Sequence, residues 1–353
     1  MSAEDLVVCS PAGLYCPAGD FYIDPWRPVD RAVITHAHAD HARAGHRYYL
    51  AAAASEHVLR ARLGDLTLDT LAWGERRRIG EVTVSLHPAG HVLGSAQVRI
   101  ERRGYVWCVS GDYKLAADPT CDAFEPVRCD VFVSESTFGL PIYRWPFDTT
   151  VFDEIGRWWR DNAAAGRPSV IACYAFGKAQ RILAGVDPAI GPIIVHGAVA
   201  VLNQAYEATG VRLPPTKLAA EASADTFGQA LVIAPPAATA SAWMRRFEGR
   251  SGRARIAFAS GWMRLRGARR RGGYDGGFVL SDHADWPGLL AAIDATGCER
   301  VIVTHGYEAA LRRFLEEKGL ASGRFDTPFG EEERTGREEP AEEVSTDVDD
   351  AAA

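Results

Sequence analysis

The chain has 353 residues, 47% of them apolar, and a formal net charge of −7. This length suits two domains, or one domain with a large insertion, and the apolar content is sufficient for a hydrophobic core. No run of about 18 apolar residues occurs, and the N-terminal residues lack a basic segment followed by an apolar one, so we expect neither a transmembrane helix nor a secretory signal.

Charge and cysteines are unevenly distributed. Residues 331–350 hold ten acids and two arginines, which together contribute −8 and leave +1 for residues 1–330. Because the segment 331–353 also lacks apolar periodicity, we expect it to be a disordered acidic tail. Seven cysteines at irregular spacing form no CxxC pair. This pattern predicts reduced thiols in a cytoplasmic protein rather than a disulfide framework or a zinc ribbon.

The first part of the chain is predicted to consist mainly of short strands. Apolar runs rich in Val and Ile end in Gly, Pro, His or Asp, which is typical of strand ends. The runs lie within residues 21–25, 31–41, 82–100, 105–113 and 130–137. An alanine-rich stretch predicts a helix over residues 41–63.

The pattern changes at about residue 140. Helical patterns at 151–165 and 178–186 alternate with apolar runs, which indicates an α/β unit with a parallel sheet. Segments at 278–285 and 300–308 then return to a strand followed by a histidine. We therefore predict one domain interrupted by an inserted α/β domain. The predicted limits are 1–140 and 277–330 for the interrupted domain and 141–276 for the insert.

Seven imidazole and carboxylate side chains follow the ends of predicted strands. They are His36, His38, Asp40, His41, His91, Asp112 and His305. A single HxH pair would not indicate a metal, but this accumulation does. Nitrogen and oxygen ligands without a thiolate suit zinc, with manganese or iron as alternatives. Seven ligands exceed one tetrahedral site and fit two divalent ions sharing a carboxylate, an arrangement used for phosphodiester hydrolysis.

The spacing within HAHADH (36–41) supports this interpretation. His36 and His38 are two residues apart, so in an extended segment they point to one side. We expect Asp40 and His41 to face a second ion as the chain turns into a helix. Asp24 either bonds a ligand histidine or is a turn residue before Pro25.

This ligand set resembles that of the metallo-β-lactamase fold, the HxHxDH hydrolases. The resemblance implies an α/β protein with an αβ/βα sandwich. It also implies a first ion held by His36, His38 and His91. The second ion would be held by Asp40, His41 and His305, and Asp112 would bridge the two ions.

Further motifs resemble the β-CASP nucleases, which carry an inserted nucleic-acid-clamping domain. They are SEST at 134–137, SDHAD at 281–285 and THG at 304–306, together with CYAFGKAQRIL at 173–183. The resemblance implies attack on phosphorus by a hydroxide held between the metals, with Asp40, Glu135 and His283 as catalytic residues. His283, oriented by Glu135, would be the general acid for the leaving 3′-oxygen. Alone, Glu135 would equally fit a buried ion pair and His283 a core histidine.

Cationic and aromatic side chains are candidates for substrate contact. Ten arginines and one acid, Glu248, occur between 245 and 271. We predict phosphate contacts for Arg264, Arg266, Arg269, Arg270 and Lys178, with a solvated loop as the alternative for the arginines. Tyr143, Trp145 and Phe147 either stack bases or pack a domain hinge, and the hinge is favoured.

Two longer runs narrow the resemblance to bacterial ligase-associated DNA exonucleases. They span residues 13–46 and 325–332. The implied activity is trimming of DNA ends in repair, with single-stranded DNA as substrate, an ATP-dependent DNA ligase and a helicase as partners, and no membrane. His305 supports a rival, because histidine at the third motif is typical of RNA-processing members such as the mRNA 3′-end-processing endonuclease. An inactive nucleic-acid-binding scaffold and a small-molecule lactonase are further alternatives.

Overall fold

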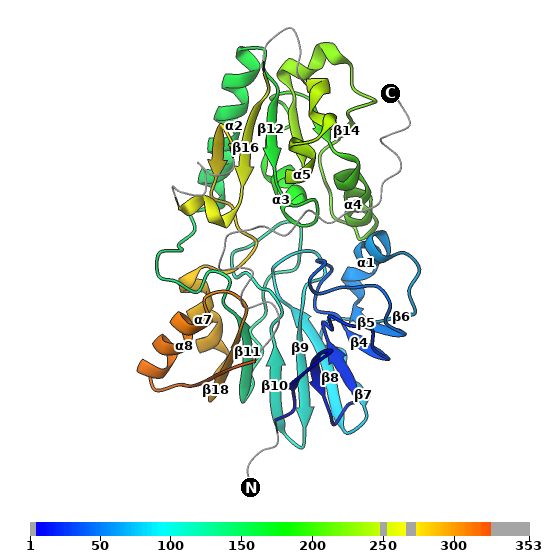
Figure 1. The fold of residues 1–353 in the computed structure, drawn as a ribbon, viewed down its shortest axis with the longest axis vertical. Coiled ribbons are helices and arrows are strands. Elements are labelled where there is room, and N and C mark those ends of the chain that lie inside the picture. The colour runs from blue at the N-terminus through cyan, green and yellow to red at the C-terminus, as the bar shows by residue number, and fades with distance from the viewer. Residues whose placement is uncertain (1–4, 248–252, 266–272, 326–353) are drawn as a thin grey trace. The chain divides into compact units, whose positions relative to one another are not determined.

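The computed structural model describes residues 5–247, 253–265 and 273–325, and the chain divides into two compact units (Figure 1). Among the described residues, the first unit combines the chain up to Arg144 with residues 283–325, and the second runs from Trp145 to Asp282. The predicted acidic tail at 331–353 lies outside the described residues. No helix in the described part of the chain is long and apolar enough to cross a membrane.

The first unit contains two sheets. One has the order β1-β2-β3-β4-β5-β6, with strands Val8–Ser10, Gly13–Cys16, Phe21–Ile23, Arg31–Val33, Tyr48–Ala52 and Leu68–Leu71. The other has the order β19-β18-β11-β10-β9-β8-β7. In chain order, its strands β7–β11 and β18–β19 are Arg77–Ile79, Val82–Pro88, Ala96–Arg102, Tyr105–Val109, Val131–Glu135, Arg300–Thr304 and Ala321–Arg324.

The core of the first unit lies between these sheets because alternate residues of each strand point inward. In β8, Val84 and Leu86 are fully buried in a cluster that also contains Val33 and Leu50 of the first sheet. Helices α7 (Trp286–Thr296) and α8 (Glu308–Glu317) cover the other face of the second sheet through a separate apolar cluster. In the first sheet, α1 (Glu56–Leu63) lies in the connection between the parallel strands β5 and β6. These layers form an αβ/βα sandwich.

The predicted helix over 41–63 is wrong for most of its length. Residues 48–52 form β5, which pairs in parallel with both β4 and β6. Only a short 3₁₀ turn (Ala53–Ser55) and α1 are helical. The alanines favour a helix locally, but strand pairing and burial between the sheets override this weak preference.

The second unit is inserted between two neighbouring strands. β11 and β18 pair in parallel, with Val131 opposite Arg300 and Glu135 opposite Thr304. The chain therefore leaves the second sheet at the end of β11 and returns to the adjacent position at β18. Residues at these strand ends are brought together although they are far apart in sequence.

The second unit is built on a sheet in which all neighbouring strands are parallel, as predicted. Its order is β14-β13-β15-β12-β16-β17. In chain order, strands β12–β17 are Ser169–Ala172, Ile193–Val195, Lys217–Leu218, Leu231–Ala234, Arg255–Ala259 and Gly276–Phe278. The helices are α2 (Asp148–Ala164), α3 (Lys178–Gly185), α4 (Gly197–Ala208) and α5 (Pro236–Thr239). The 3₁₀ helices are η2 (Ala224–Gln229), η3 (Ala242–Phe247) and η4 (Gly261–Arg264).

The sheet of the second unit is buried on both faces. In β12, Ile171 packs in a cluster with residues of α2, α3 and α4, whereas Val170 packs on the opposite face with Trp243 and Phe247 of η3. Burial on both faces explains the continuous apolar runs of its strands.

Candidate metal centre

The predicted ligands lie in loops at the ends of four strands of the first unit. The HAHADH segment follows β4, His91 follows β8, Asp112 follows β10 and His305 follows β18. The HAHADH segment is a tight turn, because the amides of His41 and Ala42 both donate to the carbonyl oxygen of His38. No helix begins at Asp40 or His41, contrary to the prediction.

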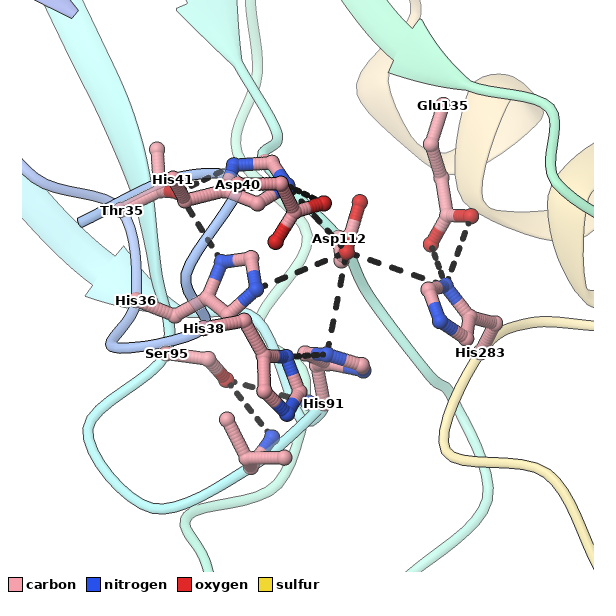
Figure 2. A network of polar contacts seen from close by, with 12 residues as sticks. Thr35, His36, His38, Asp40, His41, His91, Ser95, Asp112, Glu135 and His283 are labelled. Carbon is pink, nitrogen blue, oxygen red and sulfur yellow. Dashed lines mark hydrogen bonds and ion pairs between the residues drawn. The ribbon is translucent and has the colours of Figure 1, made fainter. Parts of the chain in front are cut away.

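Asp112 is at the centre of the cluster (Figure 2). Its Oδ2 lies 3.5 Å from Nε2 of His36, 3.5 Å from Nε2 of His41 and 3.8 Å from Nε2 of His91. One carboxylate therefore faces histidines from two different loops. This is the geometry expected of a carboxylate that bridges two cation sites.

Gly111 explains how Asp112 reaches this position. Its φ of 56° lies in the left-handed region, which favours glycine. A Cβ atom at this position would lie 2.7 Å from Cβ of Thr35. A side chain would thus push the Asp112 loop away from the segment that carries His36.

The remaining ligands flank this centre on two sides. Nε2 of His91 lies 3.1 Å from Nδ1 of His38. On the other side, Oδ2 of Asp40 lies 3.3 Å from Nε2 of His41. The ring of His305 lies 5.7 Å from that of His41, centroid to centroid, and Asp40, His41 and His305 line one small cavity. The structure therefore brings all seven predicted ligands into one region of the first unit.

A hydrogen-bond network orients the histidines. Nδ1 of His41 lies 2.7 Å from Oδ2 of Asp24. Asp24 also accepts hydrogen bonds from the amide of Thr35, at 2.8 Å, and from its hydroxyl. The Thr35 hydroxyl in turn lies 3.1 Å from Nδ1 of His36. Because Nδ1 is engaged in both rings, each Nε2 is directed toward Asp112. Asp24 is thus an orienting residue, one of the two roles considered for it.

The electrostatics of the cluster favour a cation. Burial lowers the pKa of His36 well below its usual value, so its ring is neutral and suited to ligation. Burial alone would also lower the pKa of His41, but the Asp40 and Asp112 carboxylates beside it raise that pKa well above its usual value. Positive charge is therefore stabilised at this point of the site.

The residues fit divalent metal ions. Among the described residues, three groups place their ligand atoms within 4.8 Å of one another. Two consist of predicted ligands: His36, His38, His91 and Asp112, and His36, Asp40 and His41. The third joins Asp112 to Glu135 and His283. Nε2 of His36 is buried and makes no hydrogen bond with the described residues, since its 3.5 Å contact with Asp112 is an ion-pair distance only. A buried imidazole nitrogen without a partner is costly unless a ligand satisfies it. Imidazole and carboxylate are donors that zinc accepts.

A histidine–carboxylate pair lies beside the metal ligands. Nδ1 of His283 is 3.1 and 3.0 Å from the two carboxylate oxygens of Glu135 and 4.0 Å from Oδ2 of Asp112. Glu135 is buried and also accepts a hydrogen bond from the amide of Tyr113, at 2.8 Å. Glu135 therefore fixes the His283 ring through its Nδ1 atom. Figure 2 shows Glu135 and His283 next to Asp112.

The predicted substrate contacts have different environments. Lys178 is buried and its ammonium lies 3.0 Å from Oδ2 of Asp282, so a buried ion pair takes the place of the predicted phosphate contact. Arg264 is exposed in η4. Arg266, Arg269 and Arg270 lie outside the described residues.

The three aromatic residues near residue 145 also differ. Tyr143 is fully buried, and its hydroxyl lies 3.2 Å from that of Tyr307. Trp145 is partly buried. Phe147 is 85% exposed. Tyr143 is therefore a packed residue and Phe147 is not, whereas the predicted hinge role stays a prediction.

Some functional residues could not be identified from the sequence. Thr35 links Asp24 to His36, and the main chain of Tyr113 holds Glu135. Thr35 precedes the HxH motif directly, which is the one available signal. Backbone contacts such as that of Tyr113 leave no signal in side-chain type.

Comparisons with known proteins agree with this geometry, although no family model matches the chain. A protein of Opitutus terrae named "Probable DNA ligase" is 32% identical over 311 residues, which cover 87% of this chain and 30% of that protein. The "Cleavage and polyadenylation specificity factor 73" of Drosophila melanogaster is 30% identical over 127 residues, covering 34% of this chain and 18% of that protein. The chain thus spans less than a third of either relative.

A solved structure shows the same fold. A protein of unknown function from Enterococcus faecalis V583 superposes with a TM-score of 0.56 at 13% identity, covering 85% of this chain and 80% of that one.

The sandwich with its inserted parallel-sheet unit is the predicted metallo-β-lactamase fold with a β-CASP-type insert. The similarity to the cleavage and polyadenylation factor agrees with this fold. A similarity that extends over most of the chain is to the protein named a probable DNA ligase.

Proposed function

We propose that this protein is a metal-dependent phosphodiesterase that trims DNA ends as an exonuclease. The observation that carries the proposal is the arrangement around Asp112. Its Oδ2 lies within 4.0 Å of ring nitrogens from His36, His41, His91 and His283. Three candidate metal ligands and the candidate acid His283 therefore all lie near Oδ2 of Asp112.

Two divalent ions, zinc most readily and manganese as the alternative, would be held by the seven ligands. When bound, such ions polarise phosphate oxygens and make water acidic enough to supply a nucleophile at neutral pH. The protein alone would repel a phosphodiester, because Asp40 and Asp112 place negative charge where the phosphate must approach. The Asp40 and Asp112 carboxylates instead attract cations to the ligand cluster.

His283 and Glu135 handle the proton of the leaving group. Nδ1 of His283 donates to Glu135, which fixes the ring. Nε2 then carries the proton that the departing 3′-oxygen requires. An alkoxide is a poor leaving group, so this transfer contributes most when the substrate is a nucleic acid.

DNA is the proposed substrate because the similarity that covers 87% of the chain is to a protein named for a DNA ligase. Single-stranded ends, an ATP-dependent ligase partner and a helicase partner belong to the same proposal. A cytoplasmic location belongs to the proposal as well, and it suits seven cysteines of which none forms a disulfide.

RNA is the second candidate. Histidine at position 305 supports it, as does the 30% identity to the cleavage and polyadenylation factor over a third of the chain. The chemistry at Asp112 does not distinguish the two, because water attack needs no 2′-hydroxyl.

The test uses 5′-labelled single-stranded DNA and RNA of matched sequence, with Zn²⁺ or Mn²⁺. Asp112→Ala and His283→Ala are compared with wild type and with His57→Ala, a control at an exposed histidine of α1. We expect stepwise shortening of DNA by wild type and control, and none by the two site variants. Internal cuts in RNA with intact DNA would favour the second candidate, and no cleavage of either would contradict the proposal.

A further inference from the structure

A buried ion cluster in the second unit holds the residue that precedes His283. Lys178 and Arg181 lie three residues apart on α3, so they share one face of the helix. Lys178 Nζ lies 3.0 Å from Oδ2 of Asp282, and Arg181 Nη1 lies 3.0 Å from Oδ1. Arg181 also donates to the carbonyl oxygen of Ser281. Both carboxylate oxygens and one backbone carbonyl are therefore held at this point.

The cluster is anchored within the second unit. Nη2 of Arg181 lies 2.7 Å from both carboxylate oxygens of Asp148, the first residue of α2. The guanidinium thus spans two carboxylates, Asp148 and Asp282, in a planar geometry that lysine cannot reproduce. Two helices of the unit are in this way tied to the segment that ends at Asp282.

Stability alone is a weak reason for such a cluster. Lys178, Arg181 and Asp282 are each at most 4% exposed. Removing charges from water costs several kcal/mol per ion, and apolar residues of similar volume often stabilise a protein equally well. Directional ion pairs differ from apolar contacts in fixing one position of the backbone.

The segment is also held on the other side of His283. The amide of Ala284 donates to the carbonyl oxygen of Tyr113 at 2.6 Å, and the amide of Tyr113 donates to Glu135 at 2.8 Å. His283 is therefore flanked by Asp282, held by α3, and by Ala284, held by the residue that also holds Glu135. The main chain of Tyr113 therefore contacts both Glu135 and the residue that follows His283.

We propose that Lys178 and Arg181 are positioning residues for the general acid. This role rests on the proposed function. Helix α3 holds Asp282, and Asp282 is joined to His283 by one peptide bond, so α3 keeps the His283 ring within hydrogen-bond distance of Glu135. A shift of about 1 Å would break the contacts of 3.0 and 3.1 Å between Nδ1 and the carboxylate, and misplacement of that size costs catalysis up to about 100-fold.

The kinetic test compares two substrates that differ in their need for an acid. Cleavage of DNA expels a 3′-alkoxide, which needs a proton, whereas cleavage of bis(p-nitrophenyl) phosphate expels a nitrophenolate, which needs none. We expect Lys178→Met to lower kcat on DNA about 10- to 100-fold, with little change in KM and little change on the nitrophenyl ester. Lys178→Arg should restore most of the loss. Lys217→Met, at an exposed lysine of β14, is the matched control.

A phosphate-binding role for Lys178 gives a different result. It would raise KM for DNA with kcat unchanged, and general misfolding would lower kcat on both substrates equally. Either outcome contradicts the positioning role. Asp282→Asn provides a second variant that keeps the size of the side chain and should reproduce the selective loss.

Hydrogen–deuterium exchange tests the positioning without relying on activity. In Lys178→Met and Asp282→Asn, we expect a peptide covering 279–286 to exchange faster than in wild type, with no change at 31–41. Unchanged exchange in 279–286 would overturn the inference. If wild type cleaves neither substrate, the proposed function is wrong, and the exchange measurement alone decides whether α3 positions this segment.

Discussion

Nδ1 of His41 lies 2.7 Å from the Asp24 carboxylate, and this contact sets the direction of the other ring nitrogen. Nε2 consequently faces Asp40 and Asp112, at 3.3 and 3.5 Å. A carboxylate behind a histidine fixes its tautomer and increases its basicity as a ligand. The site therefore depends on Asp24 although Asp24 itself lies behind the ligands.

The first prediction concerns this contact. Asp24→Asn removes the charge that orients His41 and should weaken divalent metal binding about 10- to 100-fold while the fold is retained. Competition with a chromophoric chelator measures the affinity. Asp30→Asn is the control, since the exposed Asp30 carboxylate pairs with Arg31 and Arg47, which are exposed as well. Equal affinities for both variants would refute the orienting role.

A second prediction concerns the acid pair. His283→Ala should lower kcat on DNA about 10²- to 10⁴-fold, because the leaving oxygen loses its proton donor. Glu135→Gln should have a smaller effect, and the double variant should be no worse than His283→Ala because the residues act as one unit. Single-turnover kinetics measure all three. Losses that multiply in the double variant would show that the residues act independently.

A third prediction concerns Phe147, whose ring is 85% exposed. If the ring stacks on a base, Phe147→Ala should weaken binding of single-stranded DNA by about 1 kcal/mol or more. Fluorescence anisotropy with a labelled oligonucleotide measures this. Ile142→Ala removes a 53% exposed apolar side chain that has no ring and should bind as wild type does. If Phe147→Ala and Ile142→Ala bind single-stranded DNA with the same affinity, the Phe147 ring does not stack on a base.

A fourth prediction concerns stability. Lys114 and Asp118 form a buried ion pair at 2.7 Å, and Asp118 also accepts from the amide and hydroxyl of Thr120. Asp118→Ala leaves a buried cation without its partner and should lower the free energy of unfolding by about 3–5 kcal/mol. Urea unfolding followed by tryptophan fluorescence measures the change. Asp65→Ala, at an exposed aspartate, should change it little.

In the same experiment, Lys114→Met combined with Asp118→Ala should recover much of the loss. Recovery is expected because the double variant buries no charge at this position. A double variant less stable than Asp118→Ala would mean that the lysine stabilises the fold by its own contacts.

Much of the site was predictable because its residues follow strand ends. Strand ends are marked locally by changes from apolar to polar residues, and HAHADH and SDHAD occur at such changes. The structure brings the loops of His36, His91 and Asp112 together, as the accumulation of ligands suggested.

Other features were not predictable from local sequence. Tyr48–Ala52 form a strand despite their helical composition, because pairing with both β4 and β6 is non-local. The burial of Lys178 depends on Asp282, about a hundred residues away. A lysine on an amphipathic helix gives no sign of such a partner, so solvent or phosphate contact was the natural expectation.

The most direct test of the central claim is a metal titration of the metal-free protein while shortening of labelled single-stranded DNA is followed. The account predicts no cleavage without metal, a rise on addition of Zn²⁺ or Mn²⁺, and a plateau near two equivalents per chain, with no recovery for Asp112→Ala. Full cleavage by the chelator-treated protein, or by Asp112→Ala, would contradict it.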